Sequence, residues 1–167
     1  MSRSCKFDVQ ADPVRRGIRG VAHIRRDGFA SLHASAGRGS GALLTHPLRY
    51  SSSSPPWDPL GLWLNLDASA AGASLKIKLL QDGEIVAHSQ VISGASADST
   101  KLLVRWVDGD PMGAISAGAE FQLRFYLSGG AQLFAFWLSN VECGASGGFV
   151  AAGGAGYAMG RDTGCPQ

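Results

Sequence analysis

Aromatic, amide, carboxylate and guanidinium side chains alternate with apolar ones in two stretches of the chain, "GLWLNLD" at 61–67 and "EFQLRFYL" at 120–127. A period of two places such side chains on one face of a β-strand. A pyranose packs its C–H face on an aromatic ring and hydrogen-bonds its hydroxyls to polar groups of these kinds. The pattern therefore predicts two sugar-binding faces. The residues concerned are Trp63, Asn65 and Asp67, then Gln122, Arg124 and Tyr126, with Trp57 in the loop "SSSSPPWDPL".

Core packing is the alternative interpretation of the tryptophans. A sandwich has two inner faces, and the sequence does not say which face of a strand points inward, so Trp63 and Trp106 are also candidates for the core. Exposure also separates a carbohydrate-binding module from a structural or assembly scaffold. A binding platform leaves a Trp ring exposed beside polar side chains, whereas a docking scaffold presents a contiguous apolar patch.

The acidic residues give no support for hydrolytic chemistry. A glycosidase requires two carboxyl groups, about 5–5.5 Å apart for retention or about 6.5–9.5 Å for inversion, one of them with a raised pKa. Asp67 and Glu120 lie where they can reach a sheet face, and nothing in the sequence pairs them. Four other aspartates of the strand region stand beside Gly or Pro and favour turns: Asp58, Asp82, Asp108 and Asp110.

Other catalytic chemistry is not indicated either. No serine stands in a GxSxG elbow, and "GRGSG" at 37–41 lacks the lysine and the following helix of a phosphate loop. No CxxC pair or zinc spacing occurs. The histidines have no partner at a fixed spacing: His23, His33, His46 and His88. We therefore expect no enzymatic activity, no cofactor and no metal site.

The tripeptide Arg26-Asp27-Gly28 predicts a turn. Asp-Gly between strand-like runs favours a hairpin because both residues readily adopt a positive φ, and Arg25 or Arg26 is expected to pair across it. Calcium bound at a sandwich edge is the functional alternative for Asp27, since that ion prefers hard oxygen ligands.

The elements that must position these residues are strands. The 167 residues include 23 Gly and 7 Pro with only 8% aromatics, which favours a turn-rich all-β protein. Roughly eight short strands without a helical period indicate a two-layer antiparallel β-sandwich of the jelly-roll kind, with the last two strands central in their sheets. We predict three short strands within 23–50 and others at 61–67, 74–81, 85–92, 101–106, 120–127 and 131–139. In "SLKIKLLQ" at 74–81, the alternation places Leu75, Ile77 and Leu79 on one face and points Lys76 and Lys78 to water. In "EFQLRFYL" the expected inward row is Phe121, Leu123, Phe125 and Leu127.

The sandwich is expected to occupy residues 21–139, between an N-terminal arm at 1–20 and a Gly/Ala-rich tail at 140–167. With 15 Lys and Arg against 13 Asp and Glu, the charge favours no nucleic acid or anionic membrane as partner. No apolar run is long enough for a membrane span, and no secretory signal is visible in the arm. One disulfide is possible and none is implied among the cysteines Cys5, Cys143 and Cys165.

Five motifs, in order, resemble those of a β-sandwich module found at the C-terminal end of proteins with a five-bladed propeller glycosidase domain of the invertase and sialidase-like kind. The resemblance covers residues 21–139. The motifs are "RRDGFASL" at 25–32, "GALLTHPL" at 41–48, "LWLNLDASAAGASLKIKLLQDGEIV" at 62–86, "ADSTKLLVRW" at 97–106 and "AGAEFQLRFYLSGGAQLFAFWLS" at 117–139.

The resemblance implies a concanavalin-like or jelly-roll sandwich that packs on the propeller or binds glycan, at an extracellular or cell-surface location. The family's catalytic carboxylates lie on the propeller, which is not part of the matched region. We therefore expect a non-catalytic carbohydrate-binding or glycosidase-accessory module, with a glycan or a glycosidase as partner. The alternative is a structural or assembly protein, a homo- or hetero-oligomer whose basic arm and Gly/Ala tail contact its neighbours.

Overall fold

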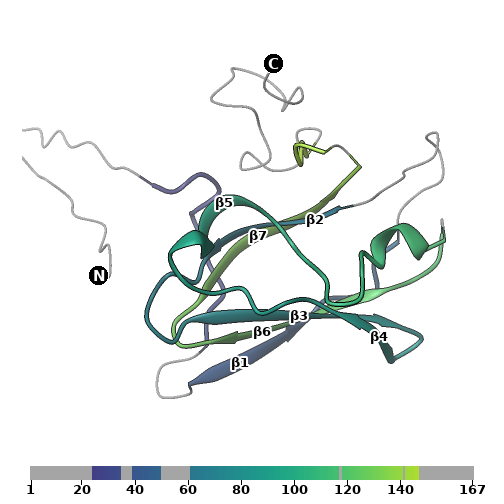
Figure 1. Cartoon of the computed structure of the whole chain (residues 1–167), viewed down its shortest axis with the longest axis horizontal. Helices are drawn as coiled ribbons and strands as arrows, with labels where there is room; N and C mark the ends of the chain where they lie inside the picture. The colour runs from purple at the N-terminus through teal and green to yellow at the C-terminus, as the bar shows by residue number, and fades with distance from the viewer. Residues whose placement is uncertain (1–23, 35–38, 50–60, 117, 141, 147–167) are drawn as a thin grey trace, which may run out of the picture.

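Two antiparallel sheets pack face to face as a β-sandwich in the computed structural model (Figure 1), which describes residues 24–34, 39–49, 61–116, 118–140 and 142–146. The four-stranded sheet has the order β1-β6-β3-β4, formed by Ser40–Leu44, Gln122–Ser128, Ser74–Gln81 and Glu84–His88. The three-stranded sheet has the order β5-β2-β7, formed by Asp98–Leu103, Gly61–Asp67 and Gln132–Ser139. The helical segments of the described residues are two 3-10 turns, η1 at Ala95–Ala97 and η2 at Met112–Ala114. The predicted all-β, two-layer antiparallel sandwich is confirmed.

The chain changes sheet at every connection between successive strands except that from β3 to β4. That connection is a tight hairpin in which Asp82 and Gly83 have φ values of 51° and 83°, the two positive angles of a type I′ turn. β6 lies inside the four-stranded sheet, as predicted. β7 was expected to be central too, but it lies at the edge of its sheet, where Leu32 and Leu133 exchange backbone hydrogen bonds of 2.8 and 2.9 Å.

The described part of residues 23–50 contains one strand rather than the three predicted. On either side of β1, Leu32 and Leu48 make only isolated bridges, to Leu133 and Phe121. Leu48 follows Pro47, which has no N–H group to continue a ladder. The short apolar runs around Leu32 and Leu48 therefore form single bridges to the sheets and do not form complete strands.

Two other predicted strands end early because their regular ladders are interrupted. β4 stops at His88, because the Ser89 hydroxyl accepts the Ile77 N–H at 2.9 Å in place of a backbone carbonyl. β5 begins at Asp98 and stops at Leu103, and the following segment pairs Trp106 with Ser89. The segment that follows β5 thereby joins the two sheets at one end.

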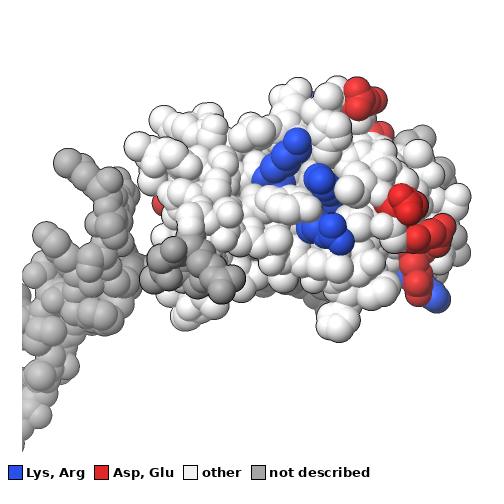
Figure 2. Space-filling model, turned by 90° about the horizontal axis from the view of Figure 1, so that it is seen from below, with Lys and Arg blue, Asp and Glu red and all other residues white. Residues whose placement is uncertain are grey.

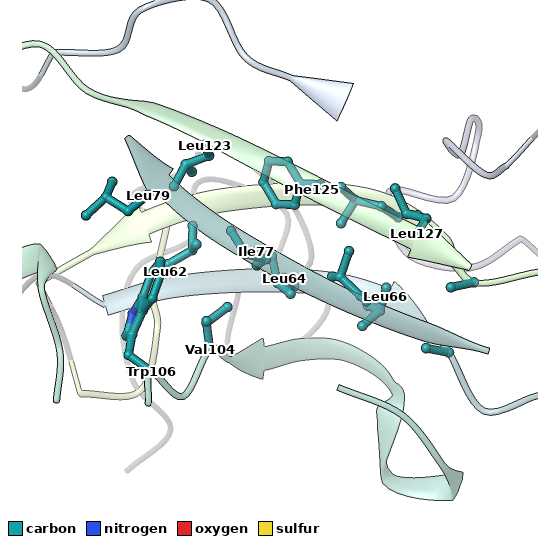
Figure 3. Close-up of a cluster of buried hydrophobic side chains, with 14 of the residues drawn as sticks. Leu62, Leu64, Leu66, Ile77, Leu79, Val104, Trp106, Leu123, Phe125 and Leu127 are labelled. Atoms are coloured by element: carbon teal, nitrogen blue, oxygen red, sulfur yellow. The ribbon is translucent and has the colours of Figure 1, made fainter. Parts of the chain in front are cut away.

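Rows of Leu, Ile and Phe from three strands meet between the sheets (Figure 3). Their members are at most 3% exposed: Leu62, Leu64, Leu66, Leu75, Ile77, Leu79, Phe121, Leu123, Phe125 and Leu127. The inward rows predicted for "SLKIKLLQ" and "EFQLRFYL" are therefore confirmed. The Phe125 ring lies 5.1 Å from the ring of Phe136 on the opposite sheet. Trp106 joins this cluster, which confirms the packing interpretation for that residue.

Replacement of Phe125 by Ala should lower the free energy of unfolding by about 3–5 kcal/mol, because the cavity between the sheets cannot collapse fully. Phe29→Ala is the control, since Phe29 is 89% exposed and its loss should change stability by less than about 0.5 kcal/mol. Urea unfolding followed by circular dichroism measures both. A small effect of Phe125→Ala would contradict the sandwich core described here.

Candidate functional site

The outer face of the three-stranded sheet carries the first predicted row, and this face is covered by the chain itself. Trp63 and Asn65 alternate with the inward leucines of β2 as predicted, yet Trp63 is only 9% exposed and Asn65 is 0% exposed. β2 is therefore buried on both faces, whereas its alternation predicts a half-buried strand. Residues 25–26 cover Asn65, and residues 144–146 cover Trp63.

Arg25 crosses this outer face and binds three groups on two strands. Its Nε donates to Asn65 Oδ1 at 2.6 Å, its Nη1 to Asp98 Oδ1 at 2.5 Å, and its Nη2 to the Leu66 carbonyl at 2.9 Å. The guanidinium also lies over the ring of Phe134, with Cζ 4.9 Å from the ring centroid. These contacts satisfy a buried amide and a buried carbonyl with one side chain, which we call the Arg25 clamp.

The clamp also fixes the Arg26-Asp27-Gly28 tripeptide. Asn65 Nδ2 donates to the Arg26 carbonyl at 2.6 Å, and the Gly28 N–H donates to the Arg25 carbonyl at 2.7 Å. Asp27 has a positive φ of 49°. The tripeptide is a turn, as predicted, but it lies against a sheet instead of joining two hairpin strands. The ion pair of Arg25 is made with Asp98 of β5 and does not cross a hairpin.

Residues 142–146 form the second cover. Trp137 Nε1 donates to the Gly144 carbonyl at 2.9 Å, and Ser139 Oγ donates to the Ala145 carbonyl at 2.6 Å. Gly144 lies so close to Trp63 that a Cβ atom there would be 2.4 Å from the indole ring. Cys143, in the same segment, is disulfide-bonded. Trp63 and Trp137 consequently pack beneath the chain as a second, smaller apolar cluster.

The facing carboxylates of this sheet do not form a hydrolytic pair. Asp67 lies directly opposite Asp98, and its carboxylate accepts hydrogen bonds from the Ser69 hydroxyl at 2.7 Å and the Ser69 N–H at 3.1 Å. The Ser69 hydroxyl is the main reason that the pKa of Asp67 is lowered, and the charge of Arg25 acts in the same direction. A general acid needs a raised pKa, so Asp67 is shifted the wrong way for that role.

The outer face of the four-stranded sheet carries the second predicted row, and its side chains are half-buried. Gln122, Arg124 and Tyr126 share this face because they alternate with the buried positions of β6. β3 lies beside β6 and places Lys76 opposite Tyr126 and Lys78 opposite Arg124. Figure 2 shows this side of the molecule, where Lys and Arg side chains gather near the middle and Asp and Glu lie toward the margin. We call Lys76, Lys78, Arg124 and Tyr126 the basic face.

Tyr126 is tied to its cationic neighbours. The Lys78 ammonium lies over the phenol ring, 5.3 Å from its centroid. A hydrogen bond from Arg124 is the main cause that lowers the pKa of Tyr126, and the positive charges of Lys78 and Arg124 lower it further. Gln122 is held in place at the other end of the row, because its Nε2 donates to the Thr45 carbonyl at 2.8 Å.

The structure therefore separates the seven predicted residues. Asn65 is enclosed, Trp63 is almost enclosed, Asp67 lies beside them at the end of β2, and Trp57 lies outside the described residues. Gln122, Arg124 and Tyr126 stay together on the other sheet. Lys76 and Lys78 were expected to point to water, and their part in the same face was missed. The alternation of apolar and polar residues in β3 shows which face the two lysines are on. Only the pairing of β3 with β6 shows that they are neighbours of Arg124 and Tyr126.

Metal-ligating and membrane-spanning features were sought in the described part of the chain. There, no three His, Cys, Asp or Glu side chains gather as metal ligands do. In the same residues, no helix has the length and apolar character needed to cross a membrane.

The chain matches no protein-family model, and comparison with curated proteins and with solved structures likewise gives no match. The two antiparallel sheets agree with the all-β sandwich class that the resemblance to the propeller-associated module implies, and the comparisons identify no family for the chain.

Arg25→Ala should cost about 1–3 kcal/mol of stability, because it leaves the Asn65 and Leu66 oxygens buried without this donor. Arg49→Ala is the matched control. Arg49 pairs with Glu120 at the surface, where the side chains are 64% and 51% exposed, so its loss should cost about 0–1 kcal/mol. Thermal unfolding of both variants makes the comparison, and equal losses would contradict the structural role of the Arg25 clamp.

Gly144→Ala should be more destabilising than Gly130→Ala. Both glycines have positive φ, 71° and 85°, so both variants lose about 1–2 kcal/mol from backbone strain. Only Gly144 abuts the Trp63 ring, which adds an overpacking cost of about 1–3 kcal/mol, whereas nothing lies within 4 Å of a Cβ at Gly130. Chemical unfolding and tryptophan fluorescence measure the difference. Identical stabilities would show that residues 142–146 do not cover Trp63 in solution.

Proposed function

We propose that this protein is a non-catalytic carbohydrate-binding module and that the outer face of its four-stranded sheet is the binding surface. One observation carries the proposal. Gln122, Arg124 and Tyr126 form a row on a half-buried sheet face, while the chain encloses most of the other predicted row. Alternate residues of an antiparallel strand are about 6.8 Å apart, so the row presents an amide, a guanidinium and an aromatic ring in succession.

The chemistry of this row suits a sugar. The Tyr126 ring offers an apolar surface for the C–H face of a pyranose, and its hydroxyl donates or accepts a hydrogen bond. Arg124 and Gln122 offer planar groups that bind pairs of hydroxyls. The row also stands on a strand inside the sheet, and Gln122 is fixed by its bond to Thr45, so the surface is preorganised.

An accessory role agrees with the acidic groups of the sheets. Asp98 is held by Arg25 and Asp67 by Ser69, and neither offers a free general acid. The resemblance to modules that accompany propeller glycosidases supports the same role. The disulfide at Cys143 supports an extracellular or cell-surface location, because disulfides persist in oxidising compartments.

Binding to a broad glycan array tests the proposal, with Tyr126→Ala as the decisive variant. Loss of the ring should weaken binding at least about tenfold, because an aromatic contact and its buried area contribute on the order of 1–2 kcal/mol. Arg105→Ala, which removes an exposed side chain outside this row, should bind as the unmodified protein does. Circular dichroism establishes that each variant is folded.

Two outcomes would overturn the proposal. If Tyr126→Ala binds glycan as tightly as the unmodified protein, the binding site is not on this face. No binding to any glycan would favour the assembly protein, in which the sandwich is a scaffold and the terminal segments contact neighbours. Sedimentation of the purified chain over a range of concentrations then measures the self-association that this alternative predicts.

A further inference from the structure

We infer that the glycan bound by the basic face is an acidic one, carrying carboxylate or sulfate groups that sit between Arg124 and Lys78 beside the Tyr126 ring. The inference rests on the proposed function and names its ligand class. It follows from three features of the described residues: the placement of the cations, the position of Lys78 over the ring, and the shape of the guanidinium group.

The cations of the basic face are placed against one another. Lys78 and Arg124 are direct cross-strand partners. Lys76 lies on the same face of β3, directly opposite Tyr126. Directly opposed side chains of a sheet have Cβ atoms about 4.5–5.5 Å apart, and like charges at that separation destabilise the pair. The ion pairs found among the described residues, Arg25–Asp98 and Arg49–Glu120, do not involve these cations. The fold therefore keeps a repulsive pair that a bound anion would relieve.

The position of Lys78 discriminates between neutral and acidic sugars. Its ammonium lies over the Tyr126 ring, 5.3 Å from the centroid, where a stacked sugar would lie. A neutral sugar must displace the Lys78 ammonium, which then loses its cation–π contact with the ring and gains no anionic partner. An acidic sugar displaces it too, but the ammonium then pairs with the incoming carboxylate or sulfate. The long lysine side chain can make this exchange without movement of the strands.

Arg124 and the neighbours of Tyr126 complete the site. A guanidinium binds two oxygens of a carboxylate or sulfate with parallel hydrogen bonds, which fixes the orientation of the acidic group. Every charged group that the strands place around Tyr126 is positive: Arg124 on β6, and Lys76 and Lys78 on β3. β1 contributes the uncharged Ala42 on the other side. The row continues beyond Lys78 to His88 of β4.

Paired probes test the ligand class. Oligogalacturonate is compared with its methyl ester, and dextran sulfate oligosaccharide with dextran, so that each pair differs only in the acidic group. Calorimetry should give binding of at least one acidic member, at least about tenfold tighter than its neutral counterpart, because charge-assisted hydrogen bonds are about twice as strong as neutral ones. Binding should weaken as salt is added, since the site is at the surface.

Lys78→Gln and Arg124→Gln should each reduce acidic-glycan binding at least about tenfold. Each removes one member of the opposed pair, so the variants should be as stable as the original protein or slightly more stable. Arg105→Gln is the matched control, which removes one positive charge from outside the basic face and should leave binding unchanged. A loss of binding that is the same in all three variants would mean that net charge alone is responsible, and would overturn the inference.

Tyr126 supplies a second measurement. An anion bound beside its hydroxyl disfavours the phenolate, so saturation with the acidic glycan should raise the pKa of Tyr126 from its lowered value. The near-ultraviolet absorbance of tyrosinate, taken as the difference between the unmodified protein and Tyr126→Phe, follows this one residue. An unchanged titration in the saturated complex would overturn the placement of the anion.

The outcomes separate this inference from the proposed function. Equal binding of acidic and neutral members leaves a carbohydrate-binding module and overturns the acidic class. Equal binding of a single-stranded DNA oligonucleotide and the acidic glycan would also overturn it, because the face would then act as a general polyanion surface. Absence of binding to every glycan overturns the proposed function, and the inference with it.

Discussion

Asn65 lies in the middle of a strand that is buried on both faces, and the arrangement of the three-stranded sheet follows from the need to bond its amide. The residue is 0% exposed, and a buried polar group without a partner costs about 1–3 kcal/mol. Arg25 and the Arg26 carbonyl supply the partners, and the Arg25 charge in turn requires Asp98. One amide therefore brings residues 25–28 onto the sheet and links β2 to β5.

The described segments cover the outer face of one sheet and leave that of the other half-buried. The turn at residues 25–28 and the segment at residues 144–146 lie against β2 and β7. The carbonyls of Arg26, Gly144 and Ala145 accept hydrogen bonds from that sheet, and the Arg25 side chain donates to it. The described segments make no comparable cover over Arg124 and Tyr126, which stay half-buried. Among the described residues the two sheets thus differ: one has chain on both sides, and the other carries Lys76, Lys78 and Arg124 on a half-buried outer face.

Alternation in the sequence predicted the all-β class, the limits of β2 and β3, and the inward rows of β3 and β6, because side-chain direction in a strand depends only on local geometry. It did not predict that Trp63 and Asn65 are covered. Their pattern is the same as that of Arg124 and Tyr126. What distinguishes the two rows is contact with residues far away in the sequence, from Arg25 to Asn65 and from Gly144 to Trp63. The sequence predicted the β6 part of the basic face, Arg124 and Tyr126, because alternation within one strand places these residues on one face. It did not predict that Lys76 and Lys78 join them, because that depends on the register between β3 and β6.

The distribution of charge partners supports the binding role that we propose. The carboxylates nearest the sheet faces are engaged, Asp98 by Arg25, Asp67 by Ser69 and Glu120 by Arg49. The cations of the basic face oppose one another across two strands and share one phenol ring. Asp98 and Asp67 belong to the three-stranded sheet and the cations to the four-stranded one, so the ion pairs of the described residues leave these cations for the acidic ligand that we propose.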